Sequence, residues 1–507
     1  MLPKQLKFGS KVESAAAKSS RVNIAPSNGT GPYNLGDTII FNIPTRASLV
    51  LVPNESYLKF NLNPFTVGAT QSHYRWDSCG AHGIIQRIRI FHGSNLLQDI
   101  DNYSLLTKML YDIQVPGDAC YGKLNVLAGT RSDLVVTPQI TVQAPAITAT
   151  AANYASTTTD GTITQPANAN IIAAVTASLN AMNAVPVPAV QINSGDVIKS
   201  SEATPKNTIT NTTSSLNTYC LNLNCLLGTL CSQNYWPLFA CTSAPLRMEI
   251  QIVSDLFKAM NCTTIPTFGA NTGLISNVEY IANFIELGDS AMSVVANSLQ
   301  GQPLQFVVPD YRNYQFSYSL AQNPTVTQVS MAIPAKFSSL KSLFITVRDQ
   351  GAGALTFFPN SSVTMNITDY QFRIGSSIFP PKSVNTLPEM FSEVLKAIGS
   401  MSDLNYQPSI EKSSYTQIKS NAVTAASEAN GAGAVGSGSF YIGIDLENYI
   451  NANKDNIFSG WNSNTDDIFA IMNFAGPAVG PVTTRFDAFA NFDTCVVFEN
   501  GTAYVRY

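Results

Sequence analysis

Charged residues are scarce in this chain. They make up 12% of its 507 residues, against about 25% in ordinary soluble proteins, and they form no long acidic or basic block. The formal net charge of -4 excludes a global electrostatic attraction to nucleic acid. A polar but weakly charged surface suits a protein that buries much of its exterior against copies of itself, although extracellular adhesins and glycan-binding β proteins have a similar balance.

Metal-ligand spacings and targeting signals are also missing. The three histidines, His73, His82 and His92, have no standard ligand spacing, which favours structural roles. None of the eight cysteines forms a CxxC pair, so we interpret them as reduced and mostly buried. Residues 1–21 lack the apolar stretch of a secretory signal, and no run approaches the roughly 18 apolar residues of a membrane span. We therefore expect a protein that is assembled inside the cell and not secreted through a signal peptide.

No motif marks a catalytic or cofactor site. The nucleophile elbow GxSxG is absent, and no carboxylate pair has the context of a glycosidase. The segment at 431–436, GAGAVG, matches GxGxxG. A dinucleotide site needs that loop to follow a strand and open a helix, whereas here it precedes the strand expected at Phe440. The sequence predicts no enzyme, no cofactor and no metal site.

What is present is a repeated pattern. The stretches RIRIFHGSNLL at 87–97 and YQFRIGSSIF at 370–379 both alternate as a strand, break at Gly-Ser and resume. Each leads into an amphipathic helix, expected around 103–113 and 388–398. Alternation followed by helical spacing is a compound signal. Its recurrence predicts one β-rich unit used twice; the alternative is chance recurrence in a long β-rich chain.

The chain length suits such a tandem, because 507 residues exceed what one hydrophobic core normally serves. We predict a first β unit at 34–288, a linker at 289–303 with helical tendency, and a second β unit at 304–507. An insertion at about 130–215 interrupts the first unit. Within it, residues 134–194 are rich in Ala, Thr, Asn, Val and Pro and carry one charge, Asp160. We interpret this as an ordered or semi-ordered excursion; a disordered linker is the alternative.

Residues 1–33 are predicted to form a flexible basic arm. Its positive residues, set against Glu13, are Lys4, Lys7, Lys11, Lys18 and Arg21. These charges can contact anionic lipid head groups or packaged nucleic acid, at about 1 kcal/mol per charge near a surface. The alternative is an ordinary solvated terminus.

Four stretches in order along the chain resemble one family. DNYSLL at 101–106, APLRMEI at 244–250, IPAKFSSLKSLF at 333–344 and YQFRIG at 370–375 together resemble the double jelly-roll major capsid proteins of icosahedral DNA viruses. The likeness is greatest to polinton, adintovirus and virophage-like members of the adenovirus hexon lineage. The resemblance implies an all-β fold of two tandem eight-stranded jelly rolls with short helices and long loop insertions.

The same resemblance implies a function and partners. It implies a structural subunit that forms pseudo-hexameric homotrimers tiling a virion shell, with the insertion on an outer tower and the arm inside. Penton and minor capsid proteins, and an internal membrane or the genome, are the implied partners, and no catalytic residue is implied. The alternatives are a virion spike or surface adhesin of β-sandwich type binding host glycans, and an enzyme on a β scaffold.

Overall fold

The structure is a computed structural model of the chain. The residues that it describes are 17–29, 31–63, 65–66, 75–130, 191–193, 196–198, 218–231, 235–261, 267–268, 273–299, 302–321, 325–349, 358–399, 408–419, 437–447, 460–475 and 482–507. The histidine at 73 and the GAGAVG segment at 431–436 lie outside these residues.

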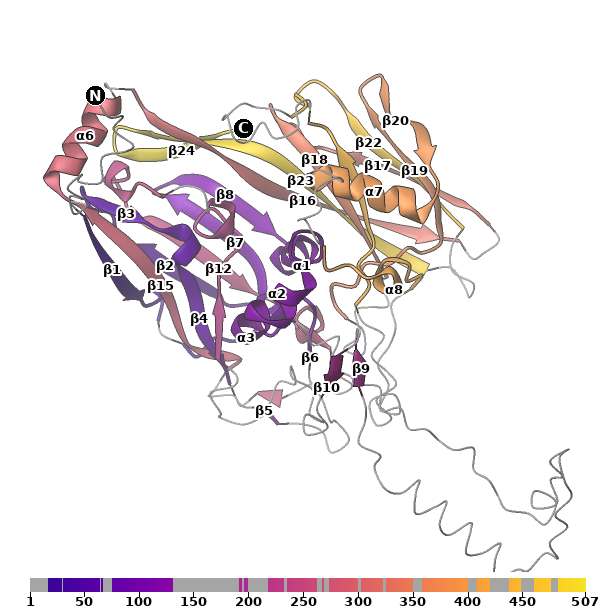
Figure 1. Cartoon of the computed structure of the whole chain (residues 1–507), viewed down its shortest axis with the longest axis horizontal. Coiled ribbons are helices and arrows are strands. Elements are labelled where there is room, and N and C mark those ends of the chain that lie inside the picture. The colour runs from indigo at the N-terminus through magenta and orange to yellow at the C-terminus, as the bar shows by residue number, and fades with distance from the viewer. Residues whose placement is uncertain are drawn as a thin grey trace, which may run out of the picture.

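The first β unit, here called the first roll, contains two antiparallel sheets (Figure 1). One has the order β1-β15-β4-β11, with β3 also paired to β15, and the other has the order β2-β12-β7-β8. The strands are β1 (Ala17–Ile24), β2 (Thr38–Ile43), β3 (Leu49–Leu51), β4 (Tyr57–Leu62), β7 (Ile85–His92), β8 (Asn95–Asp101), β11 (Thr218–Leu221), β12 (Leu246–Ile252) and β15 (Ile275–Leu287).

Shorter elements complete the first roll. Three two-stranded pairs are β5 (Phe65–Thr66) with β14 (Thr267–Phe268), β6 (Arg75–Trp76) with β13 (Met260–Asn261), and β9 (Gln191–Asn193) with β10 (Asp196–Ile198). The helices are α1 (Tyr103–Gln114), α2 (Gly117–Tyr121) and α3 (Lys123–Ala128), and the 3-10 turns are η2 (Pro53–Glu55), η3 (Gly80–Ile84), η5 (Thr229–Cys231), η6 (Leu238–Ala240) and η7 (Leu256–Lys258).

The second roll has the same architecture. Its sheets have the orders β16-β23-β18-β21, with β24 paired to β23, and β17-β22-β19-β20. The elements are β16 (Leu304–Leu320), β17 (Thr327–Ile333), β18 (Leu340–Asp349), β19 (Ile367–Ile374), β20 (Ser377–Val384), α7 (Leu387–Ile398), α8 (Lys412–Tyr415), β21 (Tyr441–Asp445), β22 (Ile468–Phe474), β23 (Val482–Glu499) and β24 (Thr502–Arg506).

The two rolls are topologically identical. If the eight main strands of each roll are numbered in chain order, both give one sheet 1-8-3-6 and a second sheet 2-7-4-5, which is the order of a jelly roll. The repeated Gly-Ser turns join strands four and five in both. Gly93 and Gly375 each have φ of +58°, a left-handed conformation that favours glycine. The prediction of one unit used twice is confirmed.

Along the strands of both rolls, buried side chains alternate with less buried ones, which explains why each roll forms a sandwich of two sheets. β4 buries Leu58, Phe60 and Leu62, and β22 buries every second residue from Ile468 to Phe474. Among the described strands, no sheet contains members from both rolls. The first core nevertheless continues into the second roll through a few side chains, which include Val308, Tyr311, Phe344, Val496 and Phe498.

The N-terminal boundary was predicted wrongly in part. Residues 17–24, expected within the flexible arm, form β1, which pairs with β15 from Ala17 opposite Leu287 to Ile24 opposite Tyr280. The side chains of β1 are exposed at all positions except the last. Backbone hydrogen bonds to the edge of β15, and not apolar burial, hold this strand, so the absence of an apolar pattern was misleading.

The connections differ between the rolls. Strands five and six of the first roll are joined through α1, α2 and α3 and then through residues 131–217, of which the structure describes β9 and β10. The predicted outer tower therefore lies mostly outside the described residues. The linker contains helix α6 (Asp289–Leu299), where a helical tendency was predicted. Among the described helices, none is long and apolar enough to cross a membrane.

Candidate functional site: the seam between the two rolls

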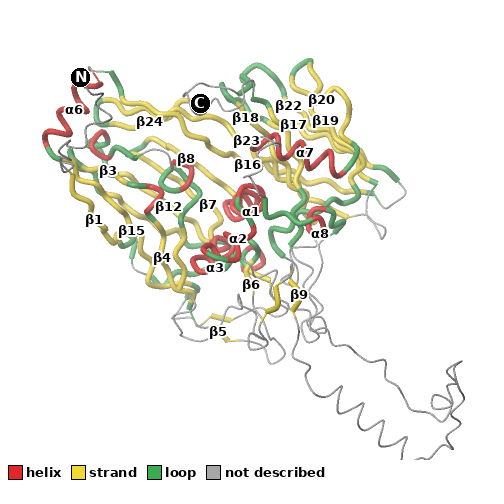
Figure 2. The backbone as a smooth tube through the Cα atoms, in the orientation of Figure 1, coloured by secondary structure: helices red, strands yellow, loops and turns green. Residues whose placement is uncertain are grey.

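The two rolls meet along an interface that we call the seam. It is formed by α1, β7, β8 and η5 of the first roll and by β16, β21, β23 and β24 of the second. Helix α1 lies between the two rolls (Figure 2). Every side chain from Tyr103 to Ile113 is buried, as expected of a helix that is covered on all sides.

An aromatic cluster closes one end of the seam. The Trp236 side chain is fully buried, and its ring lies edge-on to Phe306 and Phe498 of the second roll, with centroid separations of 5.9 Å and 5.4 Å. Phe306 and Phe498 are 5.4 Å apart. Aromatic rings bury large apolar areas in such contacts. This cluster joins the start of β16 and the end of β23 to the first roll.

A buried ion pair lies in the middle of the seam. Lys108 of α1 is completely buried and pairs with Asp112 one turn later. The Lys108 Nζ also donates to Ser439 Oγ at 3.1 Å, and the Tyr441 hydroxyl donates to Asp112 Oδ2 at 2.6 Å. Ser439 and Tyr441 belong to the second roll. A buried charge is tolerated when it is paired and hydrogen-bonded, so the second roll supplies part of the electrostatic compensation for an ion pair of the first.

Two further carboxylates bind across the seam. The Asp310 Oδ1 accepts a 2.7 Å hydrogen bond from the Gln98 side chain of β8 and a 2.8 Å bond from the Tyr311 backbone N–H. Burial raises the pKa of Asp310 from 3.8 to about 7. The second carboxylate, Asp487, is fully buried between Arg348 Nε, at 2.9 Å, and the Asn102 side chain, also at 2.9 Å.

His82 and His92 are buried and hydrogen-bonded. His82 Nδ1 is 3.1 Å from the Tyr103 hydroxyl and His82 Nε2 is 3.0 Å from the Tyr111 hydroxyl. Burial lowers the pKa of His82 to about 3. His92 joins the rolls directly: its Nδ1 accepts from the Ala503 backbone N–H at 3.1 Å. No group of described residues has the composition and spacing of a metal site.

The cysteines of the described region are also mostly buried, as predicted: Cys79, Cys120, Cys225, Cys231 and Cys241 are buried, while Cys220 and Cys495 are half-buried. Burial raises the pKa of Cys225 and of Cys241 to about 12. A thiol with such a pKa is protonated at neutral pH and a poor nucleophile. These side chains act as small apolar residues.

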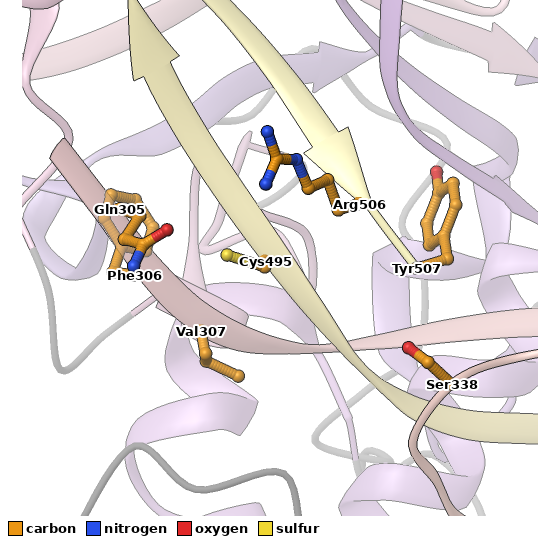
Figure 3. A pocket seen from close by; sticks show the side chains of 7 residues that line it. All are labelled: Gln305, Phe306, Val307, Ser338, Cys495, Arg506 and Tyr507. Atoms are coloured by element: carbon orange, nitrogen blue, oxygen red, sulfur yellow. The ribbon is translucent and has the colours of Figure 1, made fainter. Parts of the chain in front are cut away.

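A surface cleft of about 360 Å³ lies on the second roll beside the seam (Figure 3). Cys495 and Arg506 face each other from β23 and β24, where they are register partners. The other lining residues are Gln305, Phe306, Val307, Ser338 and Tyr507. Burial raises the pKa of the Cys495 thiol despite the nearby Arg506. Nothing among these described residues supplies an activated nucleophile and a base, so the cleft gives no chemical reason to propose a reaction.

Solved structures resemble the whole chain. The quasi-atomic model of the PBCV-1 virus capsid matches with a TM-score of 0.56 and 7% identity, covering 99% of this chain and 100% of that chain. The cryo-EM structure of the Sputnik virophage matches with a TM-score of 0.51 and 12% identity over 100% and 92% of the two chains. The chain has the double jelly-roll fold of viral capsid proteins. The Faustovirus major capsid protein gives a TM-score of 0.51 and 10% identity over 97% and 93%.

These matches confirm the predicted fold class and come from structure alone, since no family model and no curated protein sequence matches the chain. In this double jelly roll the seam holds the two rolls together through contacts between side chains that are buried. Its polar contacts fix orientation, because buried polar groups tolerate few alternative pairings.

Of the predicted site residues, the structure describes Lys18 and Arg21, and neither lies in the seam. Lys4, Lys7 and Lys11 lie outside the described residues. Lys18 and Arg21 lie on β1, not on a flexible arm, and the Arg21 guanidinium is 5.8 Å from the ring centroid of Tyr57.

Sequence reasoning missed the seam itself. The only signal was Lys108 within the apolar helix pattern Leu105, Leu106, Met109 and Leu110. A lysine and an aspartate four residues apart usually indicate an exposed helix pair, so this spacing does not predict burial.

Proposed function

We propose that this protein is the major capsid protein of an icosahedral virion, a structural subunit that forms pseudo-hexameric homotrimers tiling the shell. The observation that carries the proposal is the nearly complete match in both directions to the PBCV-1 capsid chain, 99% of one and 100% of the other. The two chains are therefore similar over both jelly rolls, and not only over one β-sandwich of a common type.

The seam supports a tile rather than two tethered domains. A shell subunit must transmit force between its neighbours without bending, and inter-domain interfaces that are small and polar permit motion. Here the hydrophobic core of the first roll continues into the second, and a buried aromatic cluster joins the two. Two jelly rolls held in one orientation form a broad body whose flanks can be buried against copies of itself.

The purified protein is expected to be a trimer at micromolar concentration. Permanent oligomers bury more than about 2,000 Å² at each interface, so dissociation should be undetectable by light scattering. Negative-stain images should show particles of pseudo-hexagonal outline that pack into hexagonal arrays. A well-folded monomer that forms no arrays would contradict the proposal, and glycan binding by such a monomer would favour a surface adhesin.

We further propose that the arm preceding β1 contacts an internal membrane or the genome through Lys4, Lys7 and Lys11, and that penton and minor capsid proteins are additional partners. Replacing these three lysines by glutamine should spare folding and trimerisation. It should impair particle assembly most at low salt, where the attraction of the unmodified arm is least screened. Normal particles in normal yield would show that the charges are incidental. Lys18→Gln is a matched control, because Lys18 lies on β1.

A further inference from the structure

The buried carboxylates of the seam differ in how their charge is compensated. Asp112 pairs with Lys108, and Asp487 Oδ2 lies 2.6 Å from Arg348 Nη2. Asp310 is 2% exposed, yet no lysine or arginine among the described residues forms an ion pair with it. A buried carboxylate without a cation beside it is costly to ionise.

The hydrogen bonds of Asp310 suit a protonated side chain. The Gln98 amide and the Tyr311 backbone N–H both bind Oδ1, at 2.7 Å and 2.8 Å, and within the described part of the chain no group donates to Oδ2. Asp77, which is also fully buried, differs because it accepts a backbone N–H on each oxygen, the one on Oδ2 from Asn360 at 2.8 Å. A proton on Oδ2 of Asp310 leaves both bonds at Oδ1 in place.

Several charged or titratable groups face Asp310 from the elements packed around it. They are Asp99 of β8, Cys225 before η5, Tyr311 and Arg312 of β16, and Tyr507 after β24, while β23 places Phe492 opposite. Burial raises the pKa of Cys225 to about 12 and also raises the pKa of Tyr311 and of Tyr507, so these three groups are neutral near pH 7.

Arg312 is the nearby cation, but aromatic rings hold it. Its guanidinium lies 5.5 Å from the ring centroid of Phe337 and 5.2 Å from that of Tyr507. Burial is the main cause that raises the pKa of Asp310 to about 7, and the hydrogen bonds and the charge of Arg312 oppose this rise without cancelling it. The positive charge is therefore engaged with the rings and does not replace an ion pair.

Gln98 connects Asp310 to the interior of the first roll. The Leu226 backbone N–H donates to Gln98 Oε1 at 2.8 Å, and Gln98 in turn donates to Asp310. The Gln98 side chain is fully buried. Water can therefore hydrate an ionised Asp310 only where β8 and β16 separate, and that separation breaks the contact made by Gln98.

We propose that Asp310 is a proton-operated latch between β8 and β16: the protonated side chain keeps this contact of the seam closed, and loss of the proton favours its opening while the rest of the fold stays intact. Both strands belong to one subunit, so the latch is independent of the proposed function.

His82 distinguishes opening of the latch from global unfolding. Burial lowers the pKa of His82 to about 3, so its protonation in the unfolded chain makes global unfolding harder as the pH rises toward about 6.5. Asp310 has the opposite effect. His82 is held by Tyr103 and Tyr111 of α1 and stays buried when β8 and β16 separate, so only this local opening shows the effect of Asp310 alone.

Hydrogen exchange of the full-length protein at pH 5 to 7, followed by mass spectrometry at single-residue resolution, tests the latch. The Leu226 and Tyr311 amides report on it, because they bind Gln98 and Asp310. After correction for the intrinsic rate, their protection should fall by about 50-fold between pH 5 and 7, since opening gains about tenfold per unit between the two pKa values. Protection of the Asn360 amide, which binds Asp77 across the seam, should not fall.

Two variants assign the effect. Asp310→Asn keeps an acceptor oxygen for Gln98 and Tyr311 and does not titrate, so the protection of both amides should become independent of pH. Asp99→Asn is the matched control on the same strand, β8, and should keep the fall seen in the wild type.

Three results would overturn the latch. The first is protection at Leu226 and Tyr311 that does not change with pH in the wild type. The second is a fall that persists in Asp310→Asn, which would assign the titration to another group. The third is a parallel fall at Asn360, which would show that the opening is not confined to β8 and β16.

Discussion

Asp112→Ala lowers the free energy of unfolding by about 3–5 kcal/mol, the usual cost of breaking a buried ion pair by removing one of its members. Lys108 remains completely buried in this variant and loses Asp112, while Tyr441 loses the acceptor of its 2.6 Å hydrogen bond. Urea unfolding followed by circular dichroism measures the change, and the m-value reports whether the rolls still unfold together.

The control variant removes the charge of Lys108 as well as that of Asp112. Lys108→Met combined with Asp112→Leu leaves neither group buried alone, so it should recover much of the lost stability. Tyr441→Phe should cost less than Asp112→Ala, about 1.5–3 kcal/mol, since it removes the hydrogen bonds of the hydroxyl to Asp112 and from Lys108 but leaves the ion pair in place. A single Asp112→Ala variant as stable as the wild type would mean that α1 moves and Lys108 reaches water.

The second large effect is on the pH dependence of the free energy of unfolding, to which His82 and Asp310 contribute in opposite directions. The pKa of His82 is lowered to about 3 by burial, so between about pH 6.5 and 3 the unfolded chain binds a proton that the folded chain does not. The free energy of unfolding therefore falls as the pH falls through that window, by about 1.4 kcal/mol per unit. His82→Gln should remove this slope.

Asp310 acts in the other direction. The pKa of Asp310 is raised from 3.8 to about 7. Between these two pH values the folded chain binds a proton that the unfolded chain does not, so the free energy of unfolding falls as the pH rises. Asp310→Asn should remove this loss and become more stable than the wild type by about 2–4 kcal/mol near pH 8.

The measurement is unfolding free energy against pH for the wild type and both variants. The difference between His82→Gln and the wild type should grow as the pH falls below about 6.5. The difference between Asp310→Asn and the wild type should grow as the pH rises above about 4. A constant difference across either window would show that the residue titrates alike in the folded and unfolded chains.

The sequence alone determined the repeated unit of this protein. Two features of the repeat are set by residues close together in the sequence. A strand exposed on one face alternates with period two, as residues 87–91 and 370–374 do. The turns that follow require φ above zero, which Gly93 and Gly375 adopt. Local physics therefore sufficed to identify two β units, their hairpins and the helices after them.

Only the tertiary structure decided which parts of the chain are paired or buried against each other. β1 has no apolar pattern because β15 holds it through its backbone. Lys108 and Asp112 have the spacing of an exposed helix pair and are buried because the second roll covers α1. Asn102 binds Asp487 across 385 positions of sequence. Local periodicity does not encode such partners, since the burial of a side chain depends on what the rest of the chain places against it.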